Sequence, residues 1–187
     1  MSNSCPLIPI TSEAYGVDIE IKYATSDNFT GVPVYAAPKC FLHEVAAEYL
    51  KKAVTIADKL GYRLRIYDTY RPTEAQWKLW EHTPDPDFLA DPRRGSPHSR
   101  GVAIDLTLCT PDGVPLDMGT AFDAFTPLSH HANTEIPVAA QRNRILLLGI
   151  MSAAGWDFYS KEWWHYQLFN ARAFPLWGDK EAGTEMM

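Results

Sequence analysis

Residues 102–108 constrain the fold more than any other segment, because a carboxylate interrupts an otherwise apolar run there. Side chains alternate between the two faces of a β-strand. One face of this segment is therefore apolar, and the other carries Asp105 between the small side chains of Ala103 and Thr107. We predict a buried strand whose second face leaves room for a metal ion beside Asp105.

His98 lies an odd number of residues before Asp105. On one unbroken strand the two side chains would point to opposite faces. Gly101 lies between them, and glycine permits a break in the strand. We therefore expect His98 to belong to a loop that folds back toward Asp105.

A second stretch, residues 163–169, is rich in aromatic side chains and has the composition of a strand. His165 lies on this strand. Glu162 precedes it, in a turn with Ser160 and Lys161. Both stretches therefore place polar groups at the ends of strands.

These residue types suit a zinc site. A catalytic zinc ion takes three protein ligands and keeps a fourth position for water. His98, Asp105 and His165 would supply the three ligands for one zinc ion per chain, and Glu162 would act as general base. Taken singly, such an aspartate is usually a surface charge and such a histidine is usually hydrogen-bonded or solvated. The four residues together favour a zinc hydrolase site, without a CxxC or HExxH signature.

The same residues form a longer pattern, Ser-x-His-x-x-Gly-x-Ala-x-Asp at 96–105 and Glu-x-Trp-His at 162–165. This pattern resembles that of the zinc D-Ala-D-Ala peptidases. The strings His-Ser-Arg-Gly, Asp-Leu-Thr-Leu and Glu-Trp-Trp-His-Tyr are similar to those of the VanX-type D-alanyl-D-alanine dipeptidases, and the resemblance runs from about Ile19 to about Phe169. It implies an α+β domain with a central antiparallel sheet flanked by helices and zinc at the strand ends.

Arg71 lies where a strand over residues 62–67 gives way to a helix that begins near Pro72. From the residues alone, a surface ion pair with Asp68 or Glu74 is the better interpretation. The string Tyr-Arg-Pro changes this interpretation, because it resembles a string of the dipeptidases in which the matching arginine stabilises the transition state. A guanidinium group keeps its charge and can donate two hydrogen bonds to an oxyanion.

The resemblance also implies substrate contacts. Asp123 would bind the free ammonium group of a dipeptide, and Ser96 would lie near the substrate's carboxylate. Without the resemblance, a solvated loop aspartate is the more common explanation of Asp123. The tripeptide Ser129-His130-His131 is tempting as a second metal motif, but adjacent histidines point apart in either regular element, and its role stays open.

Apolar residues follow helical spacing over residues 42–60 and 137–154, and Gly61 and Gly155 are placed to end these helices. We further expect a strand over residues 17–23, a helix over 73–81, a loop over 84–95 at the mouth of the site, a hairpin joining 156–159 to the His165 strand, and a fraying tail from Phe174. Helix and strand signals do not alternate regularly, which favours an α+β fold over a parallel doubly wound sheet.

A chain of 187 residues with 46% hydrophobic side chains is expected to form one domain, over residues 1–187. The net charge of −6 gives no reason to expect nucleic acid or an anionic membrane as partner, and it suits a small zwitterionic substrate. Three widely spaced cysteines support neither a disulfide framework nor a cysteine zinc site. Because the sequence shows no secretory leader and no apolar run of ~18 residues, we expect a cytoplasmic protein.

Together these observations predict a zinc-dependent dipeptidase that hydrolyses D-alanyl-D-alanine to two D-alanines. Two alternatives remain open. A D,D-carboxypeptidase acting on longer peptidoglycan peptides would have an open groove and no ammonium anchor at Asp123. A non-catalytic zinc-binding module would need neither Glu162 nor Arg71, so those residues speak against it.

Overall fold

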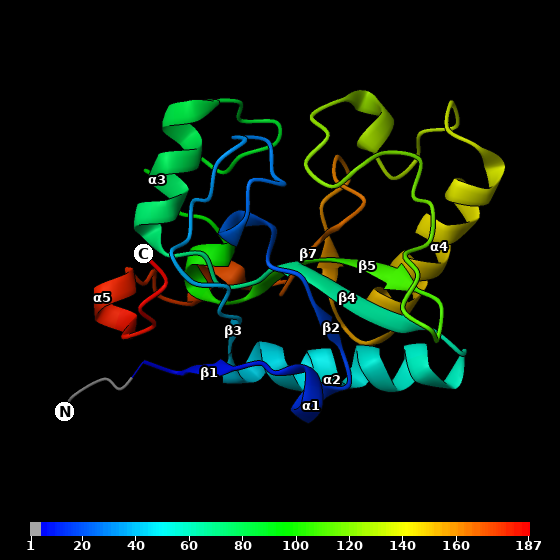
Figure 1. Cartoon of the computed structure of the whole chain (residues 1–187), viewed down its shortest axis with the longest axis horizontal. Helices are drawn as coiled ribbons and strands as arrows, with labels where there is room; N and C mark the ends of the chain where they lie inside the picture. Colours follow the sequence, from blue (N-terminus) through cyan, green and yellow to red (C-terminus); the bar gives the residue numbers. More distant parts are fainter. Residues whose placement is uncertain (1–4) are drawn as a thin grey trace.

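The computed structural model describes residues 5–187, and a five-stranded sheet with the order β2-β4-β5-β7-β6 organises it (Figure 1). Its strands are β2 (Asp18–Ile19), β4 (Arg63–Asp68), β5 (Ala103–Cys109), β7 (His165–Gln167) and β6 (Asp157–Phe158). β2 runs parallel to β4, and all other neighbours pair antiparallel. The expected α+β class is confirmed, with a mixed sheet because of the parallel edge strand.

The expected strand over residues 17–23 is reduced to β2. Its pairing with β4 ends after Ile19, and Lys22–Ala24 form a short 3-10 helix. The ammonium group of Lys22 pairs with the carboxylate of Glu20 at 2.6 Å in this turn. Alternation of apolar and polar residues therefore predicted where the strand lies, but not its length.

A second, two-stranded sheet pairs β1 (Leu7–Pro9) with β3 (Phe41–His43), and the short helix α1 (Ser12–Tyr15) follows β1. β3 leads directly into α2 (Glu44–Lys59). The Nδ1 atom of His43 accepts a hydrogen bond from the backbone N–H of Val45 at 3.2 Å and so caps this helix. The helix expected over residues 42–60 therefore begins two residues later than predicted.

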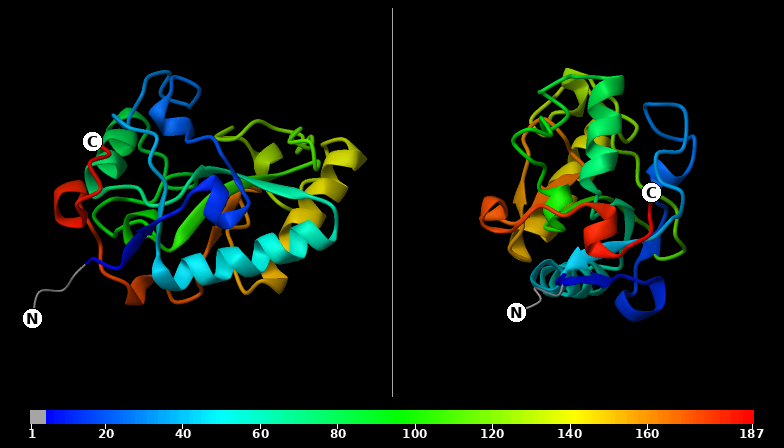
Figure 2. Two further views of the ribbon diagram at one scale, coloured as in Figure 1. Left: turned by 60° about the horizontal axis from the view of Figure 1, so that its bottom comes forward. Right: turned by 90° about the vertical axis from the view of Figure 1, so that its left-hand side faces the viewer.

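Two long helices support the sheet. α2 and α4 (Val138–Ala153) contact each other, α2 contacts β4, and α4 contacts β5 and β6. Figure 2 shows the two helices next to each other. Both end close to where the sequence predicts, at Gly61 and Gly155, whose φ angles of 76° and 98° are open to glycine without strain.

Helix α3 (Thr73–His82) and the loops after β5 lie on the side of the sheet away from α2 (Figure 1). The prediction of a helix after Pro72 is confirmed, as is that of a hairpin, in which β6 pairs antiparallel with β7. The remaining short elements are 3-10 helices at His98–Arg100, Pro127–Ser129 and Ala171–Ala173, and α5 (Asp179–Ala182). The side of the sheet that carries α3 also carries the polar groups of the candidate site.

The tail from Phe174 was expected to fray, and the structure differs. It contains α5, and the side chain of Met186 packs into the core with 1% of its surface exposed. The backbone N–H of Ala36 donates to the carbonyl oxygen of Met186 at 2.6 Å, and Asp179 accepts hydrogen bonds from Thr184 and Met186. Some of these partners lie far from the tail in the sequence, and no sequence pattern marks the others. The composition of the tail therefore does not predict that it is ordered.

Every residue of β5 is buried, because protein covers both faces of this strand. The apolar face lies in a core that extends from Ile10 to Met186 along the chain. The face that carries Asp105 lies under the loops and turns of the candidate site. Among residues 5–187, no helix combines the length and the apolar character needed to cross a membrane.

Candidate metal centre and active site

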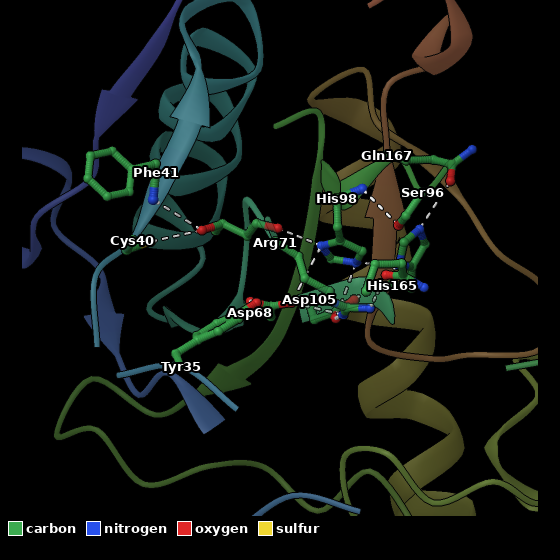
Figure 3. A network of polar contacts seen from close by, with 12 residues as sticks. Tyr35, Cys40, Phe41, Asp68, Arg71, Ser96, His98, Asp105, His165 and Gln167 are labelled. Carbon is green, nitrogen blue, oxygen red and sulfur yellow. Dashed lines mark hydrogen bonds and ion pairs between the residues drawn. The ribbon is translucent and has the colours of Figure 1, made fainter. Parts of the chain in front are cut away.

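Strand pairing brings two of the predicted ligands together. β5 and β7 pair antiparallel with Asp105 directly opposite His165, so both side chains point to the same face of the sheet. His98 lies in the 3-10 helix before β5. Gly101, with φ of 69°, ends that helix and returns the chain to β5, as predicted from the sequence. The three side chains converge from separate elements (Figure 3).

The ligand atoms lie close together. The Nε2 atom of His98 is 3.1 Å from Nδ1 of His165 and 3.3 Å from Oδ2 of Asp105, and Nδ1 of His165 is 3.1 Å from Oδ1 of Asp105. One ligand atom from each residue falls within 4.8 Å of the others, and all three residues are buried. The structure therefore brings the predicted ligand set together.

Hydrogen bonds at the outer ring nitrogens fix both imidazoles. The carbonyl oxygen of Thr69 lies 2.6 Å from Nδ1 of His98, and the amide oxygen of Gln167 lies 3.1 Å from Nε2 of His165. Because these oxygens only accept, the protons reside on those two nitrogens. The inner nitrogens, Nε2 of His98 and Nδ1 of His165, then direct lone pairs toward each other and toward Asp105. Two lone pairs and a carboxylate at such distances require a cation between them, so the donor set fits a metal ion.

The charge state of Asp105 agrees with this arrangement. Burial acts to raise the pKa of its carboxyl group, but positive charge and hydrogen-bond donation at the neighbouring His98 and His165 side chains outweigh burial and lower it below the usual range. A metal ion between the three residues would supply the same positive charge. The carboxyl group of Asp105 is thus ionised at neutral pH, as a metal ligand would have to be.

Arg71 is almost fully buried, and its guanidinium group lies between the carboxylates of Asp105, a predicted metal ligand, and Asp68. Its Nε and Nη2 atoms lie 2.9 and 2.8 Å from Oδ2 of Asp68, and Nη2 lies 3.6 Å from Oδ2 of Asp105. Nη1 donates to Oε1 of Gln76 at 3.0 Å. The ion pair with Asp68 considered from the sequence therefore exists, but it is buried within the site rather than on the surface.

Asp68 has a partner on its other side. The hydroxyl group of Tyr35 donates to Oδ1 of Asp68 at 2.8 Å. Burial raises the pKa of Asp68, and Arg71 acts against that shift. Asp68, Tyr35 and Gln76 form a fixed cradle for the Arg71 guanidinium group.

Glu162 lies in the turn before β7, as predicted, with 6% of its surface exposed. Its Oε2 atom is 3.9 Å from Nδ1 of His165, and within residues 5–187 its carboxylate makes no hydrogen bond. Burial and the carboxylates of Asp105 and Asp123 raise its pKa well above the ordinary value. A raised pKa is typical of a carboxylate that exchanges protons during catalysis.

Asp123 also lacks a full set of partners. It adopts the left-handed backbone region with φ of 59°, and its Oδ2 atom is buried without a hydrogen-bond partner among the described residues. Burial and the charge of Asp105 raise its pKa, and a hydrogen bond from Tyr23 opposes that shift. Such an unpaired carboxylate is suited to bind a cation.

Ser96 is buried beside the ligands, and its Oγ atom accepts a hydrogen bond from the backbone N–H of His98 at 3.2 Å. The seven predicted site residues all line one cavity of about 650 Å³: Arg71, Ser96, His98, Asp105, Asp123, Glu162 and His165. The loop over residues 84–95 contributes to its wall, as expected.

The tripeptide Ser129-His130-His131 takes no part in this cavity. The ring of His131 packs edge-on against Phe158 at 5.1 Å, and its backbone N–H bonds to the carbonyl oxygen of Ser160 at 3.0 Å. It supports the turn that carries Glu162.

Sequence reasoning missed several residues of the site. Tyr23, Tyr35, Gln76 and Gln167 each contact a functional group, yet each is a common residue type without a recognisable spacing to its partner. Only Gln167 offers a signal, because on a strand it shares a face with His165, two residues earlier.

Comparisons with known proteins cover the same residues. A family model of the peptidase M15 type, described as D-ala-D-ala dipeptidase, matches residues 4–176. A D-alanyl-D-alanine dipeptidase of Escherichia coli K12 is 44% identical over 180 residues, which cover 96% of this chain and 93% of that protein. Proteins of the same name from Enterococcus faecium and Streptomyces coelicolor are 39% and 37% identical, each over 82% of this chain and over 87% and 86% of their own lengths. The span that the family model matches includes the whole candidate site.

Proposed function

Because the chain belongs to the peptidase M15 family whose model is described as D-ala-D-ala dipeptidase, we propose that it hydrolyses D-alanyl-D-alanine to two molecules of D-alanine. One observation carries this proposal above the others. A buried His-Asp-His cluster that could hold a metal ion lines one cavity together with an arginine and with a glutamate and an aspartate that lack a full set of partners among residues 5–187. This cavity belongs to a chain that is 44% identical to a protein named for that activity.

The metal is zinc in this proposal, one ion per chain, held by His98, Asp105 and His165. Two neutral imidazoles and one carboxylate are a ligand set found in catalytic zinc sites. When bound, the ion supplies Lewis acidity, which polarises a carbonyl group and lowers the pKa of water.

Glu162 serves as general base and then as general acid. It takes a proton from the attacking water as the water oxygen bonds to the peptide carbonyl carbon, and it passes a proton to the leaving amine as the C–N bond breaks. Its raised pKa and its lack of hydrogen-bond partners support both steps, because the carboxylate is free to accept a proton and to release it.

Arg71 faces the carbonyl oxygen as that oxygen gains negative charge. The guanidinium group is held by Asp68 and Gln76, so little reorganisation is needed when the charge develops. Buried donors of this kind are typically worth a factor of about 10²–10³ in kcat.

The two ends of the dipeptide carry opposite charges, and the cavity offers opposite charges to match. Asp123 binds the ammonium group. Ser96 retains a hydroxyl proton to donate to the carboxylate, and Arg94, Arg100 and Arg172 line the cavity without an ion-pair partner among residues 5–187. This polarity sets the direction in which a free dipeptide binds.

A D,D-carboxypeptidase remains the second candidate, and the size of the cavity favours it. About 650 Å³ is more than two alanine residues need, so volume alone admits a longer peptide. The unpaired Asp123 favours the dipeptidase. The cytoplasmic location expected from the sequence stays a prediction.

An assay of the purified zinc enzyme separates these possibilities. We expect cleavage of D-Ala-D-Ala, little cleavage of L-Ala-L-Ala and little of N-acetyl-D-Ala-D-Ala. Preference for a longer N-acylated peptide would establish the carboxypeptidase, and inactivity toward all of them in a zinc-loaded protein would support the binding module.

A further inference from the structure

Arg144, on α4, is a buried cation outside the catalytic cavity. Only 1% of its surface is exposed, and among residues 5–187 it forms no ion pair. Burial lowers its pKa to about 10, so it stays protonated at neutral pH. A buried charge is costly unless hydrogen bonds satisfy it.

Backbone carbonyl groups satisfy this guanidinium group in place of an acid. Nε donates to the carbonyl oxygen of Met118 at 2.6 Å. Nη1 donates to those of Leu128 and His130 at 2.8 and 3.0 Å, and Nη2 lies 3.4 Å from Oγ1 of Thr120. All four acceptors belong to residues 118–130, which we call the anchor segment.

The anchor segment carries Asp123 between the points that Arg144 binds. Except for the short helix Pro127–Ser129 it has no regular structure, and Asp123 adopts a positive φ angle that is unfavourable for a residue with a side chain. Ser129 closes the segment internally, because its Oγ donates to the carbonyl oxygen of Ala124 at 2.6 Å and lies 3.1 Å from Oγ1 of Thr120. The conformation of Asp123 therefore depends on side-chain bonds that converge on Arg144.

The same bonds reach the turn that carries Glu162. Nε1 of Trp163 donates to Oγ1 of Thr120 at 2.9 Å, and the backbone N–H of Trp163 donates to the carbonyl oxygen of Ser129 at 3.1 Å. The guanidinium carbon of Arg144 also lies 6.0 Å from the centre of the Trp163 ring. One guanidinium group thus contacts both the segment of Asp123 and the residue next to Glu162.

We propose that Arg144 is a positioning residue, which acts through Thr120 and Trp163 to hold Asp123 and Glu162 in the relative placement that a free dipeptide requires. The inference rests on the proposed roles of those two acids. According to this inference, a residue on α4, outside the cavity, controls whether the enzyme prefers free or N-blocked dipeptides.

The test compares Arg144→Lys with Arg142→Lys, a matched control on the exposed side of the same helix. Lysine keeps the charge but cannot reproduce the planar set of donors. We expect the ratio of kcat/KM for D-Ala-D-Ala to that for N-acetyl-D-Ala-D-Ala to fall by about 10-fold or more in Arg144→Lys, with a raised KM for the free dipeptide and zinc content unchanged. Arg142→Lys should behave as wild type.

Thr120→Val and Trp163→Phe provide a second route should Arg144→Lys not fold. Thr120→Val removes a hydroxyl group at nearly constant volume, whereas Trp163→Phe removes the Nε1 donor together with part of a buried ring. Each should lower the same ratio by about 3-fold or more. Unchanged ratios in folded variants overturn the inference.

Amide hydrogen exchange separates failure of this inference from failure of the proposed function. If wild type does not distinguish the two substrates, the ammonium role of Asp123 is refuted, and exchange still decides whether Arg144 positions the segment. We expect amides of residues 119–129 to exchange about 10-fold faster in Arg144→Lys while β5 keeps its protection. Exchange that is unchanged in the anchor segment, or faster throughout the chain, overturns the positioning role.

Discussion

The buried carboxylates of the site fall into two pairs that are held in opposite ways. Asp68 and Asp105 are each matched by cations or hydrogen-bond donors, with Arg71 between them. Glu162 and Asp123 have far fewer partners, and burial raises the pKa of both. The matched carboxylates fix the geometry of the site, whereas the unmatched carboxylates can still bind a proton or a positively charged group of a substrate.

The largest effect should come from the matched side, at the metal ligands. His98→Ala, Asp105→Ala and His165→Ala should each lose zinc and lower kcat by about 10³-fold or more, because Lewis acid stabilisation is worth several kcal/mol. Metal analysis of the purified variants checks the cause. Full zinc content in all three would refute the ligand assignment.

Glu162→Gln tests the unmatched side with nearly no change of shape. It should retain zinc and reduce kcat by about 10²–10⁴-fold, the range for loss of a general base. Parallel measurement of zinc content and kcat distinguishes this from the ligand variants. Loss of zinc from Glu162→Gln would indicate that Glu162 is a metal ligand, and Glu162 would then belong with the matched carboxylates.

Asp68→Asn tests the difference between the two pairs directly, because it removes the charge of a carboxylate that has partners. The Arg71 guanidinium group would lose its closest partner in a buried place, which typically costs about 3 kcal/mol or more of unfolding free energy. Denaturant unfolding of the zinc-loaded protein measures it. Equal destabilisation by Glu162→Gln would remove the distinction between the two pairs.

The sequence predicted part of the candidate site, but not this contrast between the two pairs of carboxylates. Period-2 alternation in residues 102–108 and the break at Gly101 predicted how Asp105 and His98 are presented, and both are confirmed. The cross-strand register of Asp105 with His165 follows from pairing between distant strands, which no local pattern encodes.

The remaining misses share that physical cause. The ordered tail depends on contacts between Met186 and residues near Ala36, and the cradle of Arg71 depends on Tyr35 and Gln76. Each partner is an ordinary residue that becomes informative only when the chain has folded. Sequence patterns therefore predicted which residues meet at the cavity, but not which neighbours hold them in place.

Asp123 should show the next effect in size, on substrate choice. Blocking the dipeptide's amine removes its charge and leaves a desolvated carboxylate unpaired, so wild type should prefer D-Ala-D-Ala over its N-acetyl form by about 30-fold or more. Asp123→Asn should narrow this gap while it slows cleavage of the free dipeptide. Comparing kcat/KM for both substrates in both proteins tests this, and equal cleavage by wild type would favour the carboxypeptidase.

The smallest effect concerns His131, a half-buried side chain outside the cavity. Its Nε2 atom lacks a hydrogen-bond partner among the described residues. Burial, together with the nearby charge of Arg144, lowers its pKa to about 4, although a hydrogen bond to the backbone of Glu162 opposes the shift. His131 is therefore neutral in the folded protein at pH 6, whereas an unfolded chain begins to bind a proton there near its ordinary pKa of about 6.5.

The sign of the pH dependence follows from this difference. Because the unfolded chain binds the extra proton, the contribution of His131 to stability is present in full above about pH 6.5 and is lost as the pH falls toward 4. We expect wild type to lose about 1–3 kcal/mol more between pH 7 and pH 4.5 than His131→Phe does. His130→Phe serves as the control, because it makes the same replacement at the adjacent histidine and leaves His131 in place. Identical pH profiles of unfolding free energy for wild type and His131→Phe would show that His131 makes no pH-dependent contribution to stability. The lack of a hydrogen-bond partner would then not imply a shifted pKa outside the cavity.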